Sequence, residues 1–184
     1  MSIIAGLKHL HLAYFSRPEA DRPLYRAIRR CGAKKLLALG VGDCQRVIRM
    51  IAAAANFGPA LEVRFVGIDL FEARPDDGSQ GVSLKDAYRQ LKSTGASIQL
   101  LPGNPFTALA RSANALGPMD VILIAADQDA PSLERAWFYV PRLLRASTRV
   151  FQEIAGEGDQ ATHLRELTMG DIETRVAGRT RRAA

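Results

Sequence analysis

Two short apolar runs, one ending in a glycine turn and one in an acid, constrain this chain more than any other feature. The run KLLALGVGD at residues 35–43 contains Gly40 and Gly42, and the run FVGID at residues 65–69 ends in Asp69. In a nucleotide-binding βαβ unit, the first strand delivers a tight glycine turn to a helix, and the second delivers a carboxylate to a ribose diol. The runs therefore predict such a unit, with glycines that allow close approach of a ligand.

Strand and helix patterns alternate between residues 35 and 154. Continuous apolar strands between amphipathic helices form parallel sheets that are covered on both faces. We therefore expect an α/β fold with a doubly wound, mainly parallel sheet of five to six strands. The expected strands are 35–39, 63–68, 97–101, 120–125 and 149–154, and the expected helices are 22–30, 43–56, 82–94, 104–117 and 131–144.

The chain divides into four parts by these patterns. Residues 1–34 form an N-terminal helical leader, and residues 35–154 form the α/β domain. Residues 155–177 extend the same domain, with a short helix expected at 162–168 and a last strand at 172–177. Residues 178–184 form a basic tail.

Composition and charge exclude several classes of partner. The formal charge is +6, but four arginines among the last ten residues supply most of it, so we expect no nucleic-acid partner. No stretch of the sequence approaches 18 uninterrupted apolar residues, so we expect no membrane partner. The N-terminus lacks the pattern of a signal peptide, and Cys31 and Cys44 suit neither a disulfide framework nor a metal site. These features favour the cytoplasm.

Two polar residues have the positions of helix caps. Asp43 comes at or just before the start of a predicted helix, and Asn104 precedes Pro105 at the first helical position. Asp69 has two interpretations, because an acid at the end of a strand either turns the chain or binds a ligand.

The glycine pattern narrows the choice of cofactor. A dinucleotide fingerprint needs a third glycine where this chain has Gln45, and no phosphate-binding Walker loop occurs. A nicotinamide cofactor is therefore disfavoured.

Residues 35–154 resemble the class I S-adenosylmethionine-dependent methyltransferases, and most closely the small-molecule O-methyltransferases. LLALGVGD resembles the first motif of that family, FVGIDLF the second, LLPGNP the region after strand three, and MDVILIAADQDAP the strand-four motif. The resemblance implies S-adenosylmethionine as the cofactor. The cofactor-binding residues that it implies are Gly40 and Gly42 at the methionine part, Asp43 and Asp127 nearby, Asp69 at the ribose, and Leu70 and Asn104 at the adenine.

The chain departs from the family pattern at several positions. Ala38 stands where an acid usually precedes the glycines, Cys44 replaces a third glycine, and Ala125 replaces an aspartate that is often a metal ligand. We therefore expect no metal. Only about thirty residues follow the fifth strand, so the usual closing hairpin of two strands is expected to be reduced or missing.

A general base assists methyl transfer when the acceptor is a hydroxyl. The candidates are Asp127 and Glu153, at the ends of the fourth and fifth strands. The preferred hypothesis is a methyltransferase that acts on a small molecule. The alternatives are a catalytically inactive methyltransferase-like binding or interaction module and, further, a nicotinamide-dependent reductase. The sequence leaves a homo-oligomer open.

Overall fold

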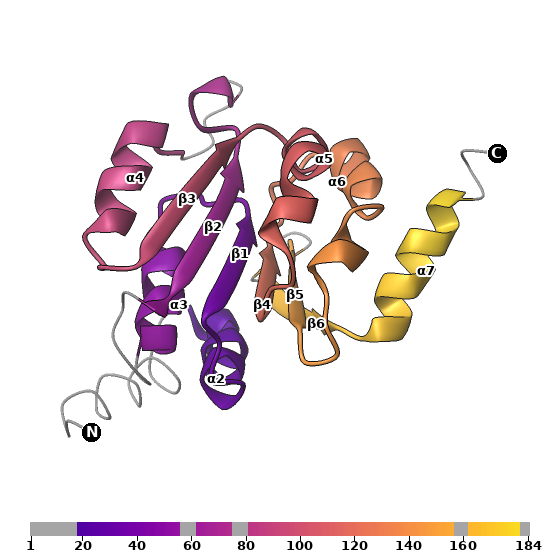
Figure 1. Cartoon of the computed structure of the whole chain (residues 1–184), viewed down its shortest axis with the longest axis horizontal. Coiled ribbons are helices and arrows are strands. Elements are labelled where there is room, and N and C mark those ends of the chain that lie inside the picture. The colour runs from indigo at the N-terminus through magenta and orange to yellow at the C-terminus, as the bar shows by residue number, and fades with distance from the viewer. Residues whose placement is uncertain (1–17, 56–61, 75–80, 157–161, 181–184) are drawn as a thin grey trace.

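A computed structural model of the protein describes residues 18–55, 62–74, 81–156 and 162–180. These residues contain one sheet of six strands in the order β3-β2-β1-β4-β5-β6 (Figure 1). Neighbouring strands are parallel, except that β6 runs antiparallel to β5. The strands are β1 (Lys35–Leu39), β2 (Arg64–Asp69), β3 (Ser97–Pro102), β4 (Val121–Ile124), β5 (Arg149–Ile154) and β6 (His163–Leu167).

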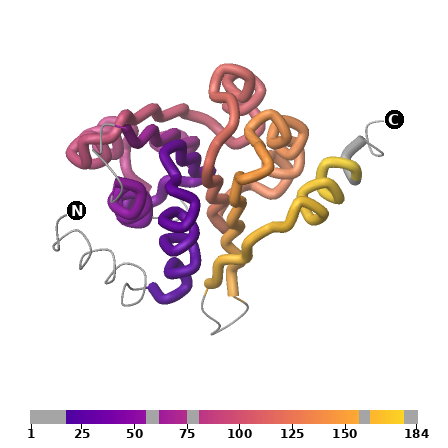
Figure 2. The backbone as a smooth tube through the Cα atoms, turned by 60° about the horizontal axis from the view of Figure 1, so that its bottom comes forward, coloured from indigo at the N-terminus to yellow at the C-terminus, as the bar shows by residue number. Residues whose placement is uncertain are grey.

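Helices cover both faces of this sheet, which gives three layers. Figure 2 shows α2 and α3 (indigo to purple) on one side of the sheet, and α5 and α6 (salmon to orange) on the other. The α-helices are α2 (Arg22–Arg30), α3 (Gln45–Ala55), α4 (Leu84–Lys92), α5 (Pro105–Leu116), α6 (Ala130–Ala136) and α7 (Met169–Thr180). Short 3-10 helices are η2 (Glu19–Asp21), η4 (Phe71–Ala73) and η5 (Val140–Leu143).

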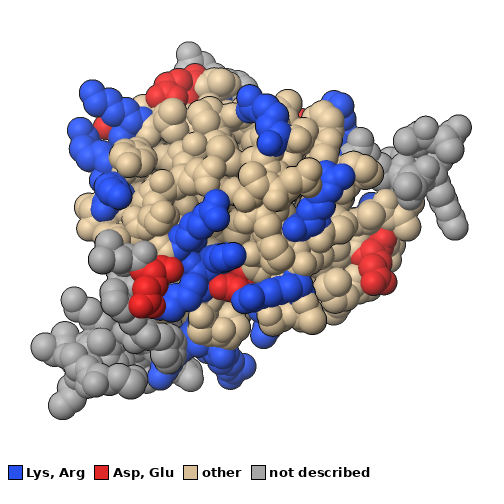
Figure 3. Space-filling view, in the orientation of Figure 1, with Lys and Arg blue, Asp and Glu red and all other residues tan. Residues whose placement is uncertain are grey.

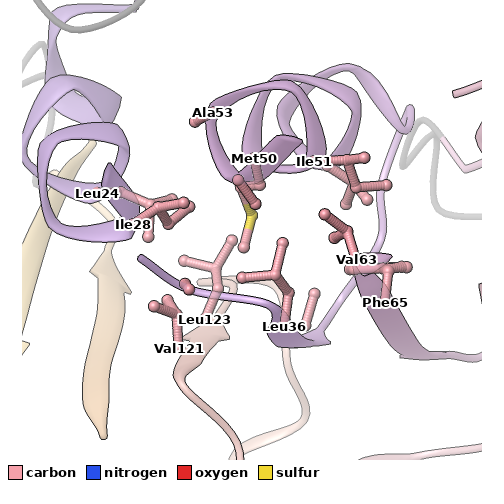
Figure 4. Close-up of a cluster of buried hydrophobic side chains, with 14 of the residues drawn as sticks. Leu24, Ile28, Leu36, Met50, Ile51, Ala53, Val63, Phe65, Val121 and Leu123 are labelled. Carbon is pink, nitrogen blue, oxygen red and sulfur yellow. The ribbon is translucent and has the colours of Figure 1, made fainter. Parts of the chain in front are cut away.

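The apolar strands build two cores because successive side chains of a strand point to opposite faces. Leu36 of β1 belongs to the core under α2, α3 and α4, and its neighbour Leu37 belongs to the core under α5, α6 and α7. Figure 4 shows Ile28 of α2 and Met50 of α3 directed toward Leu36 and Leu123. A strand buried on both faces therefore needs the unbroken apolar run that the sequence displays.

The strand order places a candidate ligand site at one edge of the sheet. The chain moves from β1 to β2 and β3 on one side, and then crosses to β4 and β5 on the other. At such a switch point the loops after neighbouring strands diverge and leave a crevice at the carboxyl ends of the strands. The loops that follow β1, β2 and β4 meet there.

The predicted fold class is confirmed, and most predicted elements occur within a few residues of their expected bounds. The expected helix 131–144 is wrong in its second half. α6 ends at Ala136, and residues 140–143 form the separate 3-10 helix η5. Pro141 explains the break, because proline lacks an N–H donor and its ring clashes with the carbonyl four residues earlier in an α-helix.

The two predicted C-terminal elements are also wrong, because strand and helix occur in the opposite order. Residues 163–167 form strand β6, and the expected strand 172–177 lies within helix α7. Leu164 and Leu167 have helical spacing, but in a strand that spacing places them on opposite faces. Each packs against a different core, and the pairing of β6 with β5 fixes the strand.

Among the described residues one antiparallel strand, β6, lies beside β5, as expected for a reduced closing hairpin. The division of the chain into four parts stays a prediction. α7 runs past residue 178, and residues 1–17 and 181–184 lie outside the described residues. No helix within the described ranges is long and apolar enough to span a membrane.

Candidate active site

The glycine turn after β1 is shaped by its neighbours as well as by its own backbone. Gly40 has φ +95° and Gly42 has φ +58°, which are left-handed conformations that glycine adopts without strain. A Cβ on Gly40 would lie 2.6 Å from Cβ of Ala125, whereas a Cβ on Gly42 would meet nothing within 4 Å. Gly40 therefore permits close packing of β4 on the turn, and Gly42 leaves open space beside it.

Cys44 continues this turn in place of a third glycine. It has φ +68° although it carries a side chain, and it is fully buried in the core under α3. Burial, followed by the negative charges of Asp43 and Asp69, raises the pKa of its thiol to about 11. The side chain is therefore a neutral thiol at neutral pH, and it contributes packing.

Asp69 at the end of β2 holds the glycine turn in place. Its Oδ2 accepts hydrogen bonds from the backbone N–H groups of Val41 at 2.7 Å and Gly42 at 3.2 Å, and its Oδ1 accepts one from Phe71 at 3.1 Å. The side chain of Arg74 also donates to Oδ1 at 2.7 Å and to Oδ2 at 2.8 Å. Burial by itself would raise the pKa of Asp69, but Arg74 and the backbone donors outweigh it and lower the pKa. Asp69 is therefore a buried, ionised carboxylate.

Arg74 connects this carboxylate to the end of β4. Its second terminal nitrogen donates to Oδ2 of Asp127 at 2.8 Å. The Arg74 side chain is 13% exposed and the Asp127 side chain is 44% exposed, so the ion pair lies at the protein surface and is partly accessible to solvent. Oδ1 of Asp127 accepts a further hydrogen bond from Gln128 at 2.8 Å.

Glu153 at the end of β5 has a comparable arginine partner. It pairs with Arg46 of α3, and Arg46 also contacts the buried carboxylate of Asp21, 3.0 Å away. The backbone N–H of Ala126 donates to Oε2 of Glu153 at 3.1 Å. Burial by itself would raise the pKa of Glu153. The hydrogen bonds from Arg46 and Ala126 together outweigh burial, so the pKa of Glu153 is lowered.

A cavity of about 660 Å³ opens between these groups. Its lining includes sequence-predicted residues from three strand ends: Gly40, Gly42, Asp43, Asp127 and Glu153. Asp21, Arg46 and Arg49 complete its charged wall. The cavity is therefore lined by both signs of charge and by the open side of the glycine turn.

Three of the predicted residues do not line this cavity: Asp69, Leu70 and Asn104. Leu70 is half-buried directly after Asp69. Oδ1 of Asn104 accepts a hydrogen bond from the Thr107 N–H at 2.9 Å, which confirms Asn104 as the N-cap of α5. Asp43 is exposed, and its carboxylate caps the backbone N–H of Gln45 at 3.0 Å. The part of the chain that the structure describes contains no cluster of three or more potential metal ligands.

The architecture has counterparts among solved structures. An O-methyltransferase from Streptomyces achromogenes, involved in tomaymycin synthesis and solved with S-adenosylmethionine, matches with a TM-score of 0.57 and 14% identity over 98% of this chain and 78% of that one. An O-methyltransferase from Bacillus cereus, solved with S-adenosylhomocysteine, has a TM-score of 0.52 and 16% identity over 82% of this chain. A precorrin-6y C5,15-methyltransferase from Geobacter metallireducens has a TM-score of 0.50 and 14% identity over 78% of this chain.

The chain has the fold of the class I methyltransferases. It covers only 62% of the Bacillus protein and 66% of the Geobacter protein. Neither a scan against protein-family models nor a search of curated proteins finds a match.

Within this methyltransferase fold, sequence reasoning missed the two arginines that engage the candidate acids. Arg74 follows Asp69 by five residues, and Arg46 is 107 residues from Glu153. A helix or loop arginine with ordinary polar neighbours is usually solvent-exposed, so neither carries a local signal. Their partners are determined only when β2, β4 and β5 align in one sheet.

Proposed function

We propose that this protein binds S-adenosylmethionine at the carboxyl ends of β1, β2 and β4 and transfers its methyl group to a small molecule. The observation that carries the proposal is the carboxylate of Asp69, which holds the glycine turn through two backbone N–H groups beside a cavity of about 660 Å³. The S-adenosylmethionine and S-adenosylhomocysteine bound in two of the structural neighbours support the same assignment.

The residues present suit this cofactor. Gly42 has open space where a side chain would stand, so a ligand can approach its backbone. Arg46 and Arg49 supply positive charge for an amino-acid carboxylate, and Asp127 and Glu153 supply negative charge near a sulfonium. The cavity volume falls in the range of small-molecule sites, about 300–1,000 Å³.

The chemistry asks little of the protein beyond positioning. Methyl transfer is an in-line displacement at a sulfonium carbon, for which correct placement of the reactants supplies much of the rate enhancement. A hydroxyl acceptor must also lose its proton, and we propose that Asp127 receives it because this carboxylate lines the cavity and is 44% exposed. Glu153 is the second candidate, because its side chain is only 13% exposed and its pKa is lowered, chiefly by the Arg46 hydrogen bond.

The space available supports a small acceptor. The cavity would hold the methionine end of the cofactor together with the acceptor, and its lining comes from η2, α3 and the ends of β1, β4 and β5. One structural neighbour is involved in tomaymycin synthesis, which is consistent with a small acceptor.

Ligand binding is tested by thermal unfolding with S-adenosylhomocysteine and S-adenosylmethionine. A ligand at about 100 times its Kd adds roughly 2.7 kcal/mol to the free energy of unfolding. For a chain of this length the expected rise in Tm is about 5–10 °C. ATP and NAD serve as matched nucleotide controls, and a shift with either of them but with neither S-adenosyl ligand would overturn the proposal.

Catalysis needs a separate measurement. The protein is incubated with S-adenosylmethionine and a panel of small hydroxylated compounds, and release of S-adenosylhomocysteine is measured by mass spectrometry. The expected result is release that depends on one acceptor class and decreases strongly in Asp127→Asn. Ligand binding without transfer to any acceptor would favour an inactive binding module, which the pairing of both candidate acids with arginines also favours.

A further inference from the structure

Arg74 donates to both carboxylate oxygens of Asp69, the acid that the proposed function assigns to the ribose. An ionised carboxylate offers about four lone-pair sites. The backbone N–H groups of Val41, Gly42 and Phe71 use three of them, and Arg74 donates to both oxygens at 2.7 and 2.8 Å. No acceptor site therefore remains for a ribose hydroxyl while Arg74 is in place, and one remains when Arg74 is displaced.

The same guanidinium also engages the proposed general base. Arg74 donates to Oδ2 of Asp127 at 2.8 Å and Gln128 donates to Oδ1 at 2.8 Å, so both oxygens that could receive a proton already accept a hydrogen bond. One side chain therefore spans the ribose position and the reacting end of the site.

Gly81 packs directly over this arginine. A Cβ built on Gly81 would lie 3.0 Å from Nε and 3.2 Å from Cδ of Arg74. Nε itself is buried and has no hydrogen-bond partner among the described residues. The arginine is thus held between Gly81 and the two carboxylates. A buried N–H without an acceptor costs free energy, and this cost would be removed if Arg74 moved into solvent.

We propose that Arg74 sets the cofactor affinity of this site, because it competes with the ribose for Asp69 and occupies an oxygen of Asp127 until the cofactor displaces it. The inference rests on the proposed function. Displacement of Arg74 frees the ribose ligand and the base in one step, so occupancy of the cofactor site and activation of Asp127 are coupled. The apparent affinity of the native protein equals its intrinsic affinity multiplied by the fraction of molecules in which Arg74 is displaced from Asp69.

The test compares the binding of S-adenosylhomocysteine to the full chain and to Arg74→Gln by isothermal titration calorimetry. We expect binding to tighten about ten-fold or more in the variant, since the competitor is removed. Without ligand, Tm is expected to fall, because Asp69 loses its charged partner. Opposite changes in ligand-free stability and ligand affinity distinguish competition from a structural role, which would weaken both.

Gly81→Ala is a second variant that keeps the charge of Arg74. Its methyl group would press on the far end of the arginine side chain, and we expect binding to tighten in the same direction. Arg89→Gln is the matched charge control, because Arg89 is 74% exposed and pairs with Asp86 on α4. It is expected to leave the affinity unchanged.

The outcomes separate the two proposals. If the native protein binds S-adenosylhomocysteine and Arg74→Gln binds equally or more weakly, competition by Arg74 is overturned and the proposed function stands. If only the variants bind, both proposals are supported. If neither the native protein nor either variant binds, the proposed function fails and this inference fails with it.

Discussion

Gly40 and Gly42 belong to one turn but lie in different surroundings. Gly40 combines φ +95° with a site where a Cβ would lie 2.6 Å from Ala125 and 3.1 Å from Asp127. Gly42 has φ +58° and open space. At the residue scale, the first glycine is needed by the packing of β4 and the second leaves room for a ligand.

This difference predicts unequal effects of alanine. Gly40→Ala is expected to lower the free energy of unfolding by about 3 kcal/mol or more, because a strained φ and overpacking act together. Gly42→Ala is expected to lower it by about 1 kcal/mol, the cost of the left-handed conformation alone. Urea unfolding of both variants measures the difference, and equal losses would contradict the close contact at Gly40.

The candidate acids also show how far single residues can be interpreted. Asp69, Asp127 and Glu153 stand at strand ends as the sequence indicates, and their positions follow from the strand pattern. Their roles stay predictions, since the structure gives each of them an arginine partner that the sequence does not announce.

At the scale of elements, α7 begins with a cap whose residues are present in the sequence, although the sequence pattern predicts a strand at 172–177. Thr168 and Asp171 form a reciprocal cap: the Thr168 hydroxyl accepts from the Asp171 N–H at 3.1 Å, and Asp171 accepts from the Thr168 N–H at 2.9 Å. This is a capping-box pattern with aspartate as the acid. The cap identifies residues after 168 as helical, and spacing of Ile172 and Val176 gives the helix one apolar face.

Thr168→Ala is therefore expected to destabilise the protein by about 1 kcal/mol. Thr174→Ala is the matched control, because its hydroxyl only bonds back to the Gly170 carbonyl at 2.8 Å within the helix. The free energy of unfolding in urea measures both. A loss in Thr174→Ala as large as in Thr168→Ala would show that the cap does not stabilise α7.

At the scale of the whole molecule, buried carboxylates tie stability to pH. Asp69 and Glu153 have pKa values that are lower in the folded protein than their ordinary values. A lowered folded pKa contributes stability that is fully present above the unfolded pKa, about 4, and is lost as pH falls through the folded value. The protein is therefore expected to unfold more readily as pH decreases from about 5 to 3.

Urea unfolding at pH 7, 5, 4 and 3 measures this dependence. Glu153→Gln should be less stable at pH 7 and should lose less stability on acidification, because its amide does not titrate. Glu62→Gln is the control, since Glu62 is an exposed partner of Lys34. An unchanged pH dependence in Glu153→Gln would contradict the role of the Arg46 pair.

The sequence by itself determined the five parallel strands, the turn at Gly40 and Gly42, the acid at Asp69 and the cap at Asn104. These features are local: apolar runs, glycine conformations and caps depend on neighbours within a few residues. The sheet then brings the strand ends together, so the place of the site followed as well.

Only the tertiary structure decided the rest. β6 is a strand because β5 offers it a backbone ladder, although the spacing of Leu164 and Leu167 is helical. Arg74 and Arg46 became part of the site because the sheet aligned carboxylates that are far apart in the chain. A charged side chain has many possible partners, and only the packing of the folded chain selects among them. Local patterns therefore indicated where the candidate site lies, and the tertiary structure determined its charge pairs.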